Sequence, residues 1–231
     1  EDNAHPELSG ELTPGSITYR IYVDLKPGYT FQMAYGAPNH ELFIKSTDLF
    51  YNHLEYGAEY PNRIPLRTYP RNCTRLDSWL SAGGVGENQI EVLKSEDDTL
   101  NVLKTSGQYL KNDSKKMGLS LEHVDGLKEK YNQTFPTFYQ MDSTIKGLGS
   151  ITNTNTISIN NGAWACMGKG VQGADSLNNK VLIAQLTTHG ELSYQLNLLI
   201  GTPEGKSEKY VAHDPMEGEF THPDLFLKRT K

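Results

Sequence analysis

The segment 168–173 reads Gly-Lys-Gly-Val-Gln-Gly, which matches the G-x-G-x-x-G pattern of a turn that holds a dinucleotide pyrophosphate. That chemistry needs a preceding strand, a long helix that opens at the last glycine and an acidic residue about 20 positions later. Only seven residues separate Gly173 from an apolar pattern that begins at Val181, so the helix has no room. We therefore expect a loop here and no nucleotide cofactor.

Histidine is the side chain best suited to proton transfer near neutral pH, and the sequence has seven. Two are followed closely by a carboxylate, His123 by Asp125 and His213 by Asp214, an arrangement that can orient an imidazole. No G-x-S-x-G nucleophile motif accompanies them, and no pair has HxxxH or HxH spacing. The acidic run 96–98 lacks the ligand spacing and the glycine of a calcium-binding loop. We expect solvated histidines, no catalytic residues and no metal site.

The two cysteines, Cys73 and Cys166, lack the CxxC spacing of metal and redox sites. A disulfide between them would close a long loop and stabilise the fold by roughly 4–5 kcal/mol in an oxidising compartment. Two buried thiols are the alternative. We favour the disulfide, because a chain with a small apolar fraction and many polar loops gains most from a covalent link.

The chain has 13 Tyr, 7 Phe and 2 Trp, and an aromatic ring that faces outward can stack on a sugar ring. Trp79 lies opposite the strand face of Leu76 and Leu80, and Tyr22 lies opposite the apolar face of its own strand. We take Trp79, Tyr22 and Trp164 as candidates for glycan stacking. The alternative is that these rings pack in the core or in cross-strand pairs.

The composition is that of a folded and mildly acidic protein. Of the 231 residues, 36% are hydrophobic, and the net charge is −6. No apolar run approaches the roughly 18 residues of a membrane helix, so we expect no membrane span. The 22 Lys and Arg are scattered along the chain, which argues against nucleic acid as a partner.

Apolar and polar residues alternate with a period of two in much of the sequence, which predicts β-strands. The clearest case is 16–25, followed by the turn Lys26-Pro27-Gly28 and a second alternating stretch at 29–35. We expect these two strands to pair as a hairpin. Further strands are expected at 41–46, 49–52, 74–81, 156–160, 181–188, 191–201 and 209–212.

No long helical pattern separates these strands, so we predict an all-β fold, an antiparallel β-sandwich of jelly-roll or Ig-like type. Residues 1–15 are expected to form an N-terminal arm, 16–212 the sandwich domain and 213–231 a C-terminal tail. The alternation weakens at about 87–149, where we expect a mixed or irregular insertion. If a long strand such as 191–201 lies unprotected at the edge of a sheet, copies of the protein or its partners can assemble on it by strand addition.

Two groups of motifs follow one another in a distinctive order. The first is Ile-Thr-Tyr-Arg-Ile-Tyr-Val-Asp-Leu at 17–25, Gly-Tyr at 28–29 and Leu-Asp-Ser-Trp-Leu-Ser at 76–81. The second is Gly-Ala-Trp at 162–164 and Lys-Val-Leu-Ile-Ala-Gln-Leu-Thr-Thr at 180–188. Over about half the chain, they resemble a poorly characterised β-sandwich module of Bacteroidota surface proteins, which often accompanies type IX secretion sorting domains. The resemblance implies a secreted, non-enzymatic module with no catalytic residues to carry over.

These observations lead to one principal hypothesis for function. We expect an extracellular, non-enzymatic structural or adhesion module at a cell surface, which binds other surface proteins or copies of itself. A lectin-like module that binds glycans is the alternative. A hydrolase with its site in 87–149 is a third hypothesis, and it requires a histidine and a carboxylate within reach of a nucleophile or a water.

Overall fold

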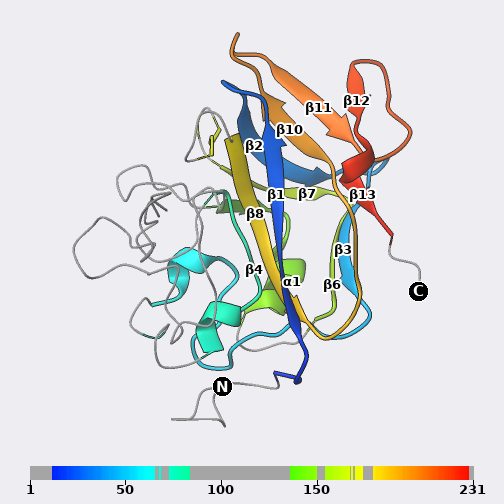
Figure 1. Ribbon diagram of the computed structural model, residues 1–231. Coiled ribbons are helices and arrows are strands. Elements are labelled where there is room, and N and C mark those ends of the chain that lie inside the picture. The colour runs from blue at the N-terminus through cyan, green and yellow to red at the C-terminus, as the bar shows by residue number, and fades with distance from the viewer. Residues whose placement is uncertain are drawn as a thin grey trace, which may run out of the picture.

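The computed structural model describes residues 12–65, 68, 73–83, 136–149, 154–166, 168, 170–173 and 179–228 (Figure 1). Within these ranges the protein is mostly β-strand. Its helical segments are short, for example α1 (Asp142–Ile145) and the 3-10 turn η4 (Cys73–Leu76). No helix of the described part is long and apolar enough to cross a membrane. The prediction of an all-β fold is confirmed.

The described strands form three sheets. Neighbouring strands are antiparallel in all of them, except that β11 and β12 are parallel. The first sheet has the order β1 (Ile17–Leu25), β8 (Asn179–Thr188) and β4 (Trp79–Leu80). The second has the order β12 (Glu219–Thr221), β11 (Ser207–Val211), β10 (Leu198–Gly201), β2 (Thr30–Gly36), β7 (Gly162–Cys166) and β5 (Pro136–Tyr139). The third has the order β13 (Phe226–Leu227), β9 (Leu192–Gln195), β3 (Leu42–Ser46) and β6 (Thr156–Ile159).

The first strand shows how the alternation is used. Ile21, Val23 and Leu25 are buried, whereas Asp24 is exposed, as expected for a strand with one face toward the core. β1 pairs with β8 along its whole length, and a bulge after Ile21 shifts the register. The interior that β1 faces is a single hydrophobic core, to which all three sheets contribute.

The expected hairpin of the first two strands is wrong. β1 belongs to the first sheet and β2 to the second, so the turn at 26–29 carries the chain from one sheet to another. Gly28 has a φ of 82°, a conformation that favours glycine in a tight turn. Asn179 holds this turn, because its Nδ2 donates to the carbonyl oxygens of Lys26 and Tyr29, both at 2.9 Å. Alternation therefore identified the strands but not their partners.

A second change of sheet divides the predicted strand 191–201, since β9 lies in the third sheet and β10 in the second. Between them stands Asn197, which is 1% exposed. Its Nδ2 donates to the carbonyl oxygens of Tyr35 at 3.2 Å and His40 at 2.8 Å, and its Oδ1 accepts from the Ala212 N–H at 3.2 Å. Both β9 and β10 have a described neighbour on each side, so this segment is not an unprotected edge strand.

The end of the predicted insertion is part of the sheets and of the core. β5 pairs with β7, and the segment after it buries Met141 and Leu148 completely. The insertion expected at about 87–149 therefore packs with the rest of the fold from residue 136 onward. Its earlier residues lie outside the described ones.

The predicted C-terminal tail, 213–231, also joins the sheets in its described part. β12 pairs with β11, and β13 pairs with β9. A buried contact joins β12 to the turn after β2, since His40 Nε2 lies 2.9 Å from Glu219 Oε2 and both side chains are 5% exposed. The expected boundary at residue 212 does not separate this segment from the domain.

The predicted strand 74–81 is a 3-10 turn, η4, followed by the two-residue strand β4. Between them Asp77 is fully buried, and its carboxylate accepts hydrogen bonds from the His53 N–H at 2.7 Å and the Ala58 N–H at 2.9 Å. Asp77 thereby fixes the loop that contains both residues. Burial raises the pKa of the Asp77 carboxyl well above its usual value, although the two N–H groups act in the opposite direction.

We expect Asn197→Ala to lower the free energy of unfolding by about 2–4 kcal/mol, because it leaves buried main-chain groups of three segments without their partner. Urea unfolding measures this loss. The matched control is Asn161→Ala in the exposed turn after β6, for which we expect a change below about 0.5 kcal/mol. Equal losses in the two variants would contradict the assigned role of Asn197.

The raised pKa of Asp77 predicts a pH dependence of stability. Because the folded state binds the proton more tightly than the unfolded state, the contribution of Asp77 is greatest below about pH 3.8, its ordinary pKa, and declines as the pH rises toward the folded value. We therefore expect the stability of the wild type relative to Asp77→Asn to fall over this interval, as measured by urea unfolding at several pH values. A difference that is constant or rises with pH would overturn the assignment.

Candidate functional site

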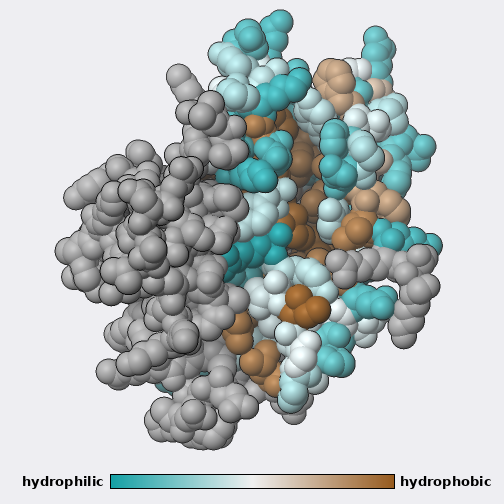
Figure 2. Space-filling view, in the orientation of Figure 1, coloured by the Kyte–Doolittle hydropathy of each residue, from teal (hydrophilic) through white to brown (hydrophobic). Residues whose placement is uncertain are grey.

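A pocket of about 290 Å³ opens between β1 on one side and β9, β10 and β11 on the other. In the space-filling view, hydrophobic side chains line a hollow there, with more polar flanks (Figure 2). The 3-10 turn η9 (Pro223–Leu225) adds a further part of the wall. The pocket therefore collects residues from all three sheets.

Aliphatic side chains make up the floor of the pocket. They come from the inward face of β1, from alternate positions of β10, from the corner between β9 and β10, and from η9. Such a surface favours an apolar group over a solvated one. The seven aliphatic residues are Ile21, Val23, Leu25, Leu196, Leu198, Ile200 and Leu225.

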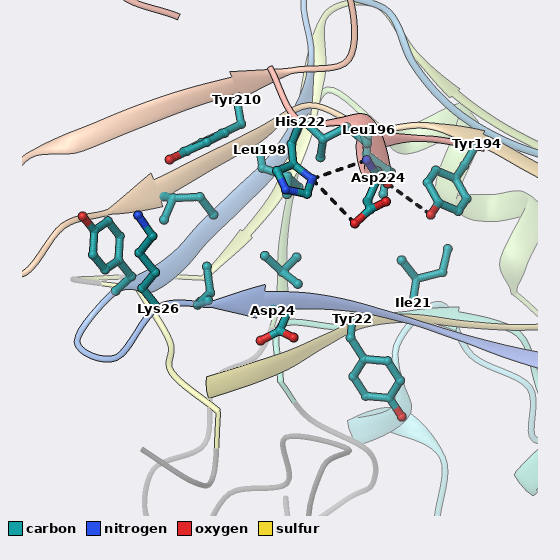
Figure 3. Close-up of a pocket in the computed structure, with 15 residues that line it drawn as sticks. Ile21, Tyr22, Asp24, Lys26, Tyr194, Leu196, Leu198, Tyr210, His222 and Asp224 are labelled. Carbon is teal, nitrogen blue, oxygen red and sulfur yellow. Dashed lines mark hydrogen bonds and ion pairs between the residues drawn. The ribbon is translucent and has the colours of Figure 1, made fainter. Parts of the chain in front are cut away.

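One wall of the pocket is the main chain of β1. All residues from Ile21 to Lys26 line the pocket in unbroken succession. Successive side chains of a strand point to opposite faces, so such a run includes the strand backbone. Figure 3 shows Ile21 directed toward the pocket and Tyr22 and Asp24 directed away from it. Since β1 ends the order of its sheet among the described strands, the pocket lies along the outer edge of a β-strand.

Tyrosines stand at the rim of the pocket, with Tyr210 and Tyr194 at its opposite ends (Figure 3). The Tyr194 hydroxyl donates to the Asp224 carbonyl oxygen at 3.2 Å, and the Tyr210 hydroxyl donates to Glu208 Oε2 at 2.9 Å. Burial raises the pKa of Tyr194, with a smaller effect of the Asp224 charge. Burial, reinforced by Glu208, raises the pKa of Tyr210 to about 12. Both phenols stay protonated at neutral pH, and their hydrogen bonds hold the rings in place.

His222 and Asp224 lie on the same rim but are arranged as the cap of η9. His222 Nδ1 accepts a hydrogen bond from the Asp224 N–H at 3.4 Å and lies 3.7 Å from Asp224 Oδ2 (Figure 3). None of the described residues that line the pocket is Ser, Thr or Cys. The described lining thus combines an aliphatic surface with the polar ends of Tyr, His, Asp and Lys side chains.

A second pocket, of about 250 Å³, contains the residue types of a catalytic triad without its geometry. His189 Nδ1 lies 3.8 Å from Asp48 Oδ2, beyond hydrogen-bond distance. Ser16 Oγ, which also lines this pocket, donates to the Thr13 carbonyl oxygen at 2.7 Å. These residues do not form a relay that would activate the serine.

Two of the three glycan-stacking candidates are wrong. Trp79 is 3% exposed in β4, and Trp164 is 0% exposed in β7, so neither indole has a face available for a sugar. The prediction for Trp79 assumed a regular strand from 74 to 81, whereas η4 breaks the alternation. Tyr22 is partly exposed and points away from the pocket, so its role in binding stays a prediction.

The structure gives no support to the disulfide between Cys73 and Cys166. Cys166 is buried, and its Sγ lies 3.0 Å from the Phe31 carbonyl oxygen, as expected for a thiol that donates. The side chain of Cys73 lies outside the described part of the chain, so the disulfide stays a prediction.

The other motifs of the sequence contribute no site in the described residues. In the glycine motif at 168–173, Val171 forms an isolated bridge with Phe31, and β8 begins at Asn179, which leaves no room for the long helix of a dinucleotide site. The ring of His213 packs on Phe226 with 4.7 Å between centroids. No group of possible metal ligands occurs among the described residues. The acidic run 96–98 and the histidine at 123 lie outside them.

Sequence reasoning missed the pocket and its tyrosines. Tyr194 falls on the apolar face of a predicted strand, which gave a reason to place it in the core. Its position at a rim depends on which strands of different sheets lie opposite one another, and no local pattern contains that information.

Comparison of the chain with protein-family models, with curated proteins and with solved structures found no match.

Proposed function

We propose that this protein is a non-enzymatic binding module of an extracellular cell-surface assembly, and that a protein partner places an apolar group in the pocket beside β1. The observation that carries the proposal is an aliphatic floor flanked by tyrosines whose hydroxyls are already hydrogen-bonded. Protein interfaces are enriched in tyrosine, and their binding energy is concentrated where an apolar anchor fills a pocket. Rings that are fixed before binding lose little conformational entropy when the partner arrives.

The extracellular setting is supported by the sequence resemblance to a secreted surface module associated with type IX secretion. The proposed fold is a β-sandwich, supported by antiparallel sheets that share one core. Surface attachment and adhesion require a stable binding face, and a pocket built on strands of three sheets provides one.

A glycan is the alternative occupant. Tyrosine faces at the rim favour it, because sugars stack on aromatic rings. The aliphatic floor favours a protein side chain instead, since it offers no hydrogen-bond partners for sugar hydroxyls. We therefore place the protein partner first.

Photo-crosslinking on intact cells that produce the protein tests this proposal. A photoreactive phenylalanine analogue replaces either Asp224, at the rim of the pocket, or Tyr139, on the distant edge strand β5. We expect cross-linked protein from the rim position and none from Tyr139. The change Val23→Trp, which fills the pocket, should lower the yield by about tenfold, because an apolar anchor contributes at least that factor to affinity.

The matched control is Ile17→Trp, which puts the same indole on the same strand at a residue that is 55% exposed and does not line the pocket. It should leave the cross-link unchanged, and thermal unfolding should show that both variants fold. Cross-links that appear only after cell disruption contradict the extracellular setting. Cross-links that are equal from both positions or insensitive to Val23→Trp contradict the binding site. Loss of the rim cross-link on addition of free sugars would favour the glycan.

A further inference from the structure

The edge of β1 gives the pocket a property that an apolar cavity alone does not have. The wall from Ile21 to Lys26 presents the main chain of an outer strand, while the floor beside it is aliphatic. A strand edge offers N–H and C=O groups in a regular row, and an added strand can pair with them. The same partner would place every second side chain on the floor.

We propose that the partner binds as an extended peptide segment, which adds to the outer edge of β1 and buries alternate apolar side chains in the pocket. This inference rests on the proposed function, because it names how a protein partner occupies the same site. Main-chain pairing supplies hydrogen bonds that a peptide of any sequence can make. The aliphatic floor of the pocket favours peptides with apolar side chains at alternate positions.

The register of β1 limits where the added strand can pair. The register with β8 shifts between Ile21 and Tyr22, and the extra residue of this bulge lies in β8, so the part of β1 beside the pocket that includes 23–25 pairs regularly with β8. Across the pocket, Leu198 and Ile200 project from β10 with the same spacing of two. Alternate residues of a bound strand would therefore meet aliphatic side chains on the sheet opposite β1.

The charges at the rim indicate which residues the partner carries between its apolar ones. The carboxylate of Asp224 is 88% exposed at the rim, and that of Asp24, on the outward face of β1, is 69% exposed and lies 3.7 Å from Lys180 Nζ. Glu208 adds a third carboxylate where it accepts the hydrogen bond of Tyr210. Lys26 is the ammonium group among the described lining residues. This excess of acid favours a segment with Lys or Arg at the positions that face solvent.

A peptide binding experiment with backbone methylation tests the proposal on the intact chain. The probe is a fluorescent pool of peptides about nine residues long, with Val, Ile, Leu or Phe at alternate positions and Lys, Ser or Thr between them. Two further pools carry N-methyl groups on one or the other alternate set of amides, so that each blocks the hydrogen-bond donors of one strand edge. Fluorescence polarisation measures binding to the wild type, to Val23→Trp and to Ile17→Trp.

We expect the parent pool to bind the wild type and Ile17→Trp alike, and Val23→Trp at least about tenfold more weakly. One N-methylated pool should bind like the parent, and the other should be weaker by about tenfold or more, because it loses the donors that face β1. Equal binding of both methylated pools, or an equal loss for both, overturns strand addition. If no pool binds while the rim cross-link on cells persists and responds to Val23→Trp, strand addition is wrong and the proposed function stands. If the cross-link fails as well, both proposals fail.

Discussion

The arrangement of the strands in this protein depends on the hydrogen bonds of the Asn197 carboxamide. This side chain stands where the chain leaves the third sheet for the second, and it binds the end of β2, the turn after β2 and the residue after β11. The segment 35–41, the corner at Asn197 and the residue after β11 therefore meet at one side chain. Asparagine suits the position because one planar group supplies both donors and an acceptor. An aspartate could not donate, and an apolar residue could do neither.

Asn179 plays the same part at another change of sheet, where the chain passes from β1 to β2. Its Nδ2 donates to the turn, and its Oδ1 accepts from the Gly173 N–H at 2.7 Å. The two asparagines therefore fix the two walls of the pocket, since one orients the end of β1 and the other sets β9 against β10. Buried polar groups that are fully hydrogen-bonded specify one arrangement of strands, which apolar packing alone leaves open.

The sequence contained most of the strands but little of their arrangement. The alternation at 16–25, 41–46, 156–160 and 181–188 predicts β1, β3, β6 and β8 to within two residues, because one buried face imposes a period of two. The predictions of a hairpin between β1 and β2 and of a continuous strand at 191–201 were wrong. Apolar and polar residues alternate in the same way whether consecutive strands pair with each other or belong to different sheets. The short strands β12 and β13 depend on their partners and leave no such pattern. The pocket lies between sheets, so its residues could not be found before the sheets were placed.

The pairing of the first strand with β8 has a consequence for how the protein is made. Thr18 and Thr187 are 169 positions apart, yet their hydroxyls lie 2.7 Å from each other in the finished sheet. During synthesis β1 emerges well before β8, and it cannot pair until the long stretch of chain between the two strands has been made. Contacts between such distant positions form slowly, and an apolar strand without its partner is prone to aggregate while it waits. The acidic net charge of the chain and the exposed Asp24 within β1 oppose that association until the sheet closes.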